Sequence, residues 1–110
     1  MELTPFEPVS VMNFINMVEY SLNGVVSKQI LKKSSGNITL FSFDKEQQLS
    51  EHTAPFDAMA QILEGESKIS INKQAYHLKA GDSIIMPANI PHAVFATSKF
   101  KMLLTMIKGT

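Results

Sequence analysis

Short runs of β-branched and aromatic residues alternate with turn-forming residues along most of this chain. The turn signals recur about every eight to twelve residues, a spacing typical of an all-β sandwich or barrel. They lie at Asn23-Gly24, Ser34-Ser35-Gly36-Asn37, Gly65, Asn72-Lys73, Ala80-Gly81-Asp82 and Pro87 to Pro91. The pattern therefore predicts one all-β unit made of antiparallel strands.

Strands are expected between these turns, where the runs have strand length. The tight turn at Asn72-Lys73 should join two of them in a hairpin, because it separates two strand-like runs by only two residues. The predicted strands are Val25–Leu31, Ile38–Asp44, Met59–Leu63, Lys68–Ile71, Gln74–Leu78, Ser83–Met86, His92–Ala96 and Lys101–Ile107.

The first 23 residues depart from this pattern. Nearby asparagines are weak helix formers, so we predict only one or two helical turns at Val11–Met17, followed by a strand through Val18–Tyr20. The helical spacing itself is carried by Val11, Phe14, Ile15, Val18 and Leu22.

The segment before that helical turn, Thr4-Pro5-Phe6-Glu7-Pro8-Val9, is a proline-marked extended arm. Extended arms with a buried aromatic residue often add to the sheet edge of a partner. We therefore expect residues 1–23 to pack on or swap with a partner in a homodimer, and residues 24–110 to form the barrel. The alternative is a disordered tail.

Composition narrows the function classes. A length of 110 residues suffices for one hydrophobic core and is too short for two. The ten basic and ten acidic residues cancel without forming a basic stripe, so no nucleic-acid partner is expected. The absence of cysteine excludes disulfides, thiolate nucleophiles and zinc fingers. Because no signal peptide or membrane-length apolar run is visible, we expect a cytoplasmic protein with no membrane partner.

Two stretches carry a recognisable pattern, Glu51–Glu66 and Gly81–His92. They resemble the two motifs of the cupin family, in which ligating residues precede a glycine turn and a second glycine leads through a short strand and a proline turn to a final histidine. The resemblance covers roughly residues 24–107 and implies a double-stranded β-helix, a jelly-roll barrel of two antiparallel sheets. Asn89 stands where glycine is usual, and asparagine tolerates the left-handed backbone that such a turn can need.

The first motif has lost most of the metal ligands that the resemblance implies. Ala54 occupies the second histidine position and Ala58 the position of the further ligand, so only His52 and His92 still hold a ligating side chain. These imidazoles are the expected ligands of any divalent transition metal, whether Ni, Zn, Fe, Mn or Cu. A catalytic site usually has three protein ligands, so two histidines should hold such a metal weakly.

Asp57 is the candidate for a third ligand. Regular strand alternation would turn it outward, but Pro55 and Phe56 can interrupt the strand and let it turn inward. Two histidines and one carboxylate would suit non-haem iron or a similar metal. The alternative is that Asp57 makes a turn hydrogen bond.

The alanines of the first motif should also open space near His52, and barrel mouths commonly hold small ligands. His77 lies by the resemblance on an outer hairpin, which makes it structural or solvent-facing. The candidate pocket-lining residues are Ala54, Ala58, Ala60, Ile62, Met86, Val94, Phe41 and Phe43.

Three functions compete. The first is a small-molecule-binding cupin that senses its ligand and whose metal site is reduced or lost. The second is a metal-dependent enzyme, an oxygenase or isomerase that uses His52 and His92 on a small organic substrate. The third is a stability or assembly role without a ligand. The sequence has no phosphate-binding glycine loop and no nucleophile elbow that would favour other chemistry.

Overall fold

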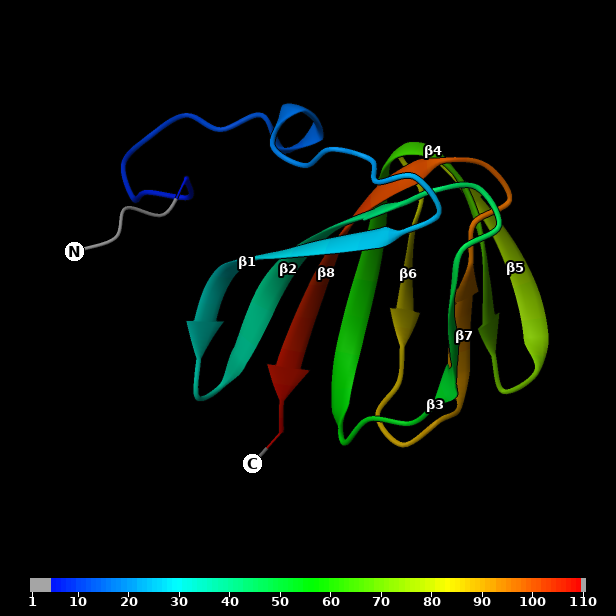
Figure 1. The fold of residues 1–110 in the computed structure, drawn as a ribbon. Helices are drawn as coiled ribbons and strands as arrows, with labels where there is room; N and C mark the ends of the chain where they lie inside the picture. Colours follow the sequence, from blue (N-terminus) through cyan, green and yellow to red (C-terminus); the bar gives the residue numbers. More distant parts are fainter. Residues whose placement is uncertain (1–4, 110) are drawn as a thin grey trace.

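The computed structural model describes residues 5–109, which form eight β-strands and one short 3-10 helix (Figure 1). No helix within this range is long and apolar enough to cross a membrane. The elements are η1 (Phe14–Asn16), β1 (Val25–Lys33), β2 (Gly36–Phe43), β3 (Gln48–His52), β4 (Phe56–Ile71), β5 (Gln74–Lys79), β6 (Ser83–Met86), β7 (His92–Phe95) and β8 (Phe100–Lys108).

The strands make two curled antiparallel sheets that share β4 (Figure 1). Sheet 1 has the strand order β1-β2-β8-β4-β6. Sheet 2 has the order β3-β7-β4-β5. Two sheets that curl over a common core are the arrangement of a jelly-roll barrel. The predicted all-β double-stranded β-helix is therefore confirmed.

Strand β4 is continuous over 16 residues, so the prediction of two separate strands was wrong. Its first half pairs within sheet 1 and its second half within sheet 2. Gly65 lies at the crossing with a φ of 79°, and a Cβ there would meet the Lys99 carbonyl oxygen at 1.9 Å. The glycine thus bends the strand between the sheets instead of ending it.

Three smaller differences have physical causes. Strand β3 was missed because it carries one apolar residue, Leu49, and forms by pairing with β7. The helical turn is only the three residues of η1, inside the predicted Val11–Met17. Residues Val18–Tyr20 form no strand, since backbone carbonyls here and just upstream accept hydrogen bonds from side chains. The predicted hairpin is confirmed, with positive φ at both Asn72 and Lys73.

One cluster of apolar side chains fills the space between the sheets. Phe43 and Phe100 are fully buried and stack with their ring centroids 4.5 Å apart. Ala58 and Ala60 of β4 belong to the same cluster and are 6% and 0% exposed. The interior beside these alanines is therefore packed by neighbouring side chains.

The N-terminal segment covers part of the outer face of sheet 1. Phe6 and Val18 are buried against Leu40 of β2, in a second apolar cluster separate from the barrel interior. Phe6 of the predicted arm therefore packs on its own barrel, whereas Pro5 and residues 7–9 are exposed. Thr4, the first residue of that arm, lies outside the described residues.

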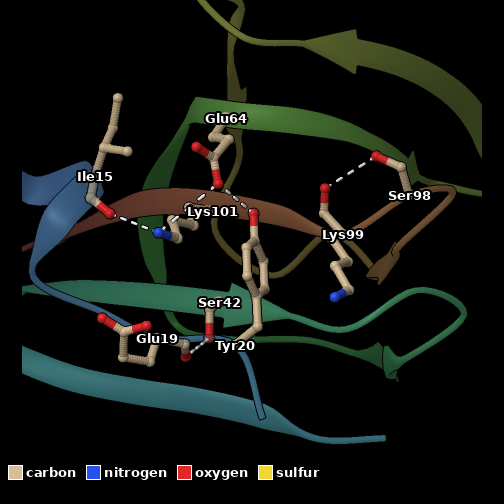
Figure 2. A network of polar contacts seen from close by, with 8 residues as sticks. All are labelled: Ile15, Glu19, Tyr20, Ser42, Glu64, Ser98, Lys99 and Lys101. Carbon is tan, nitrogen blue, oxygen red and sulfur yellow. Dashed lines mark hydrogen bonds and ion pairs between the residues drawn. The ribbon is translucent and has the colours of Figure 1, made fainter. Parts of the chain in front are cut away.

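Side chains of the barrel fix this segment by its backbone carbonyls (Figure 2). The Lys101 Nζ donates to the Ile15 carbonyl at 2.6 Å, and the Ser42 Oγ donates to the Glu19 carbonyl at 2.7 Å. The Tyr20 hydroxyl donates to the Glu64 carboxylate at 2.6 Å. Burial and this hydrogen bond raise the pKa of Tyr20 well above its usual range, so the hydroxyl stays protonated. Residues 15–20 are therefore held against sheet 1.

Candidate functional site

Two histidines face each other at one end of the barrel. His52 ends β3 and His92 begins β7, and the two residues are directly paired in the ladder between these strands. Their rings meet edge to face, with the centroids 4.4 Å apart and the planes at 65°. A shift in register after Leu49 brings His52 opposite His92. The structure thus brings together the two histidines that the sequence singled out.

Each imidazole is held by its own chain. His52 Nδ1 lies 2.7 Å from the Ser50 carbonyl oxygen, and His92 Nδ1 lies 3.2 Å from the Ile90 carbonyl oxygen. A carbonyl oxygen only accepts, so each Nδ1 carries the proton and donates. In the neutral form of each ring, Nε2 is then a lone-pair acceptor. Both rings therefore offer a hydrogen-bond acceptor, or a single metal-ligating atom, at the barrel end.

The turn that precedes His92 also borders this site. Asn89 has a φ of 64°, which confirms that asparagine supplies the left-handed backbone expected at this position. Its backbone N–H donates to the Ala54 carbonyl at 2.7 Å. This bond joins the turn of the second motif to the loop that follows His52. The two motifs are thus locked together around the histidine pair.

The two rings differ in exposure. His52 is exposed, whereas His92 is only 8% exposed. Burial lowers the pKa of His92, the hydrogen bond to Ile90 opposes this, and the nearby His52 adds to the lowering. His92 is therefore neutral at physiological pH, with its Nε2 available as an acceptor.

A family model for the cupin domain matches residues 39–108, which include both histidines. The chain belongs to the cupin family. This cupin is 36% identical to the conserved SPY1581 protein of unknown function from Streptococcus pyogenes, with a TM-score of 0.90 over 94% of this chain and 91% of that one. It is 41% identical to a cupin 2 conserved barrel domain protein from Leptotrichia buccalis, with a TM-score of 0.86 over 88% of this chain and 47% of that one.

The curated relatives are longer proteins. This cupin is 32% identical over 99 residues to the HTH-type transcriptional regulator PuuR of Escherichia coli, and the match covers 86% of this chain and 53% of the regulator. The same figures hold for the PuuR of Shigella flexneri. The chain thus spans about half the length of the curated relatives it matches.

The resemblance to metal-binding cupins implies a third ligand, and Asp57 does not provide one in this structure. Its carboxylate accepts a hydrogen bond from the Ala88 backbone N–H at 2.8 Å and is exposed, whereas the next residue, Ala58, points into the core. Regular alternation along β4 is thus kept. Asp57 instead accepts a hydrogen bond from the turn that precedes His92, 31 residues along the chain, and not the local turn hydrogen bond that was the alternative interpretation.

The donor set therefore does not fit a cupin metal centre with three or more protein ligands. Within residues 5–109, no group of three or more histidine, aspartate or glutamate side chains is placed to hold one ion. Ala54 and Ala58 have no donor atoms. What remains is a pair of imidazoles, which can bind a polar group of a small molecule as well as an ion.

Most of the candidate pocket-lining residues belong to the packed interior. Ala54 is half-buried beside the turn at Asn89, and Phe41 is half-buried at the edge of the cluster. The remaining six are 6% exposed or less: Ala58, Ala60, Ile62, Met86, Val94 and Phe43. These six side chains pack against one another in the core cluster between the sheets.

The residues that border the histidine end were not recognised from the sequence. Ile71 is the ladder partner of His92, and Leu49 is a partly buried residue of β3. The signal that could have found Ile71 is the Asn72-Lys73 hairpin, which sets the register of β4. His77, by contrast, lies on the outer hairpin as expected and is exposed.

Proposed function

We propose that this cupin is a binding module that senses a small organic molecule and has no metal chemistry of its own. The observation that carries the proposal is the replacement of two ligand positions by Ala54 and Ala58 while His52 and His92 keep their paired geometry. Such a set retains polar recognition and lacks the ligands of a catalytic ion.

The chemistry of the pair suggests what the ligand carries. Both Nδ1 atoms already donate to backbone carbonyls, so the free Nε2 atoms accept. A ligand with a hydroxyl, amine or ammonium group would supply the donor. Its apolar part would contact Ile71, the ladder partner of His92, and Leu49, the ladder partner of Val94, both of which are partly buried. The proposed ligand class is thus a small molecule with an apolar body and an N–H or O–H donor.

The relatives support a sensing role. They are named as HTH-type transcriptional regulators, and this chain corresponds to about half of one. Residues 5–109 contain only a three-residue 3-10 helix, so the described part of this chain holds no helix-turn-helix of its own. We propose that the chain performs ligand binding of the kind that a regulator uses, in the cytoplasm and without contacting nucleic acid.

A thermal-shift screen of chelator-treated protein tests this proposal. A panel of small alcohols, amines and amino acids serves as the probe set. A compound at a hundred times its Kd adds about 2.7 kcal/mol of stability, which raises the Tm of a domain this size by roughly 10 °C. The shift should disappear in His52→Leu and His92→Leu. It should persist in His77→Leu, which removes the exposed outer histidine.

The second candidate function is a metal-dependent enzyme in which the substrate completes the ligand shell. It is favoured by one observation: a histidine held through Nδ1 to a carbonyl, as both are here, is how metal-ligating histidines are commonly oriented. The same screen separates the two functions. Binding that appears only when a divalent metal is added back, with conversion of the bound compound, would support the enzyme and contradict the sensing module.

A further inference from the structure

The outer face of sheet 2 carries a shallow groove that the histidine pair does not use. On β7 and β4, Val94 and Ile69 belong to the core, so their neighbours in sequence point outward. The groove has a volume of about 300 Å³ and spans β3, β7 and β4. The polar and aromatic residues that line it are Gln48, Ser50, Glu51, Lys68, Ser70 and Phe95.

Lys68 gives this groove an uncompensated positive charge. It pairs directly with Phe95 in the ladder between β4 and β7, and its Nζ lies 5.3 Å from the centroid of the Phe95 ring. This cation–π contact places the ammonium at the groove. Within residues 5–109, no carboxylate forms an ion pair with Lys68. The other charged residue of the groove, Glu51, is already paired, because its Oε2 lies 3.1 Å from the Lys73 Nζ.

Uncharged hydrogen-bonding groups lie around this ammonium. Gln48 is the ladder partner of Phe95 on β3, and Ser50 follows it by two residues. Ser70 follows Lys68 by two residues and therefore lies on the same face of β4. In the part of the chain that the structure describes, the side chains of Gln48, Ser50 and Ser70 form no hydrogen bond. Their amide and hydroxyl groups are thus available to a ligand.

We propose that this groove binds the carboxylate of a small organic acid whose apolar part packs against Phe95. The two oxygens of a carboxylate only accept hydrogen bonds, and the groove offers them an ammonium and two hydroxyl donors, from Lys68, Ser50 and Ser70. The single negative charge balances the single uncompensated positive charge. A phosphate monoester carries about −1.5 to −2 charges, so it would leave excess negative charge near Glu51. The groove therefore favours a carboxylate.

This site is separate from the one in the proposed function. His52 and His92 lie on the inner face of sheet 2, because His92 keeps the inward phase of Val94 along β7. The groups that are recognised also differ, since the histidine pair needs a hydrogen-bond donor and the groove needs an acceptor. Binding of an acid in the groove is thus independent of the histidines.

NMR titration of isotope-labelled protein with sodium benzoate tests the proposal. Benzoate should cause saturable shifts of the backbone amide signals of Ser50, Ser70 and Phe95. Benzamide, which has the same shape without the charge, should cause no saturable shift, and inorganic phosphate should bind more weakly than benzoate. Shifts that do not saturate with benzoate would overturn the proposal. Benzamide or phosphate binding as tightly as benzoate would overturn it as well.

Substitutions at the groove test which residues hold the acid. Lys68→Met should weaken benzoate binding by at least about tenfold, because a charged hydrogen bond is lost, whereas Lys68→Arg should keep most of the affinity. Lys32→Met is the matched control, because Lys32 is an exposed strand lysine outside the groove, and its affinity should equal that of wild type. His92→Leu, which should abolish the ligand binding of the proposed function, should also bind benzoate normally. Unchanged affinity in Lys68→Met, or lost binding in His92→Leu, would contradict the assignment to the groove.

Discussion

Gly65 lies where an added side chain would collide with backbone atoms of a neighbouring strand, so Gly65→Ala should be strongly destabilising. Its φ of 79° alone costs a residue with a Cβ roughly 1–2 kcal/mol. The added carbon would also lie 1.9 Å from the Lys99 carbonyl oxygen and 2.8 Å from the Phe100 Cα, where ordinary contact begins at 3.4 Å. These are backbone atoms, and Phe100 is fully buried, so neither can move freely.

The free energy of unfolding should therefore fall by about 4 kcal/mol or more, which is exceptional for a single substitution. A domain has only about 5–15 kcal/mol of stability to lose. Urea unfolding followed by circular dichroism measures the change.

Gly81→Ala is the matched control, because Gly81 also has a positive φ, 96°, but a Cβ there would meet nothing within 4 Å. Its free energy of unfolding should fall only by the cost of the left-handed backbone, roughly 1–2 kcal/mol. If Gly65→Ala lowers the free energy of unfolding by no more than Gly81→Ala does, the argument from crowding where β4 crosses between the sheets is refuted.

Three further outcomes are expected. Lys101→Met should lower the free energy of unfolding by about 1–3 kcal/mol, because the Ile15 carbonyl loses a charged donor. Lys99→Met, at an exposed position, should change it by less than about 0.5 kcal/mol in the same urea assay. Hydrogen bonds from backbone N–H groups hold the pKa of Asp44 below 3.8 in the folded protein. Stability is therefore lost as the pH falls through this lowered pKa, because the unfolded chain binds the proton more readily. In Tm measurements across acidic pH, Asp44→Asn should show a smaller fall in Tm than wild type. Because the pKa of His92 is lowered in the folded protein, this ring binds a proton in the unfolded chain at a higher pH than in the folded one. The free energy of unfolding should therefore decrease below pH 6.5 in wild type and not in His92→Gln.

The parts of the fold that depend on local chemistry were predictable from the sequence. The hairpin at Asn72-Lys73 and the turn at Asn89 both need a left-handed backbone, and asparagine supplies it in each case. Strand β3 was not predictable in this way. Its sequence has no apolar alternation, and its partners on β7 lie 40 or more residues away along the chain.

In the candidate site, too, local features were predictable from the sequence and contacts between distant strands were not. The histidine pair followed from the motif, since each ring is oriented by a carbonyl two residues before it. The direction of Asp57 depended on the Ala88 N–H, which comes from a distant turn. The filled interior beside Ala58 depended on Met86 and Met106, the ladder partners of that residue on β6 and β8. Sequence spacing carries no information about such packing between distant strands.

His52 and His92 alone are too few protein ligands to hold a resident metal. The most direct test is the metal content of untagged protein, expressed with manganese, iron, nickel, copper and zinc in the medium and measured by mass spectrometry before and after dialysis against a chelator. We expect well below one ion per chain before dialysis, only background afterwards, and an unchanged Tm. Close to one ion of a single metal per chain, retained through dialysis and lost in His52→Leu, would contradict it.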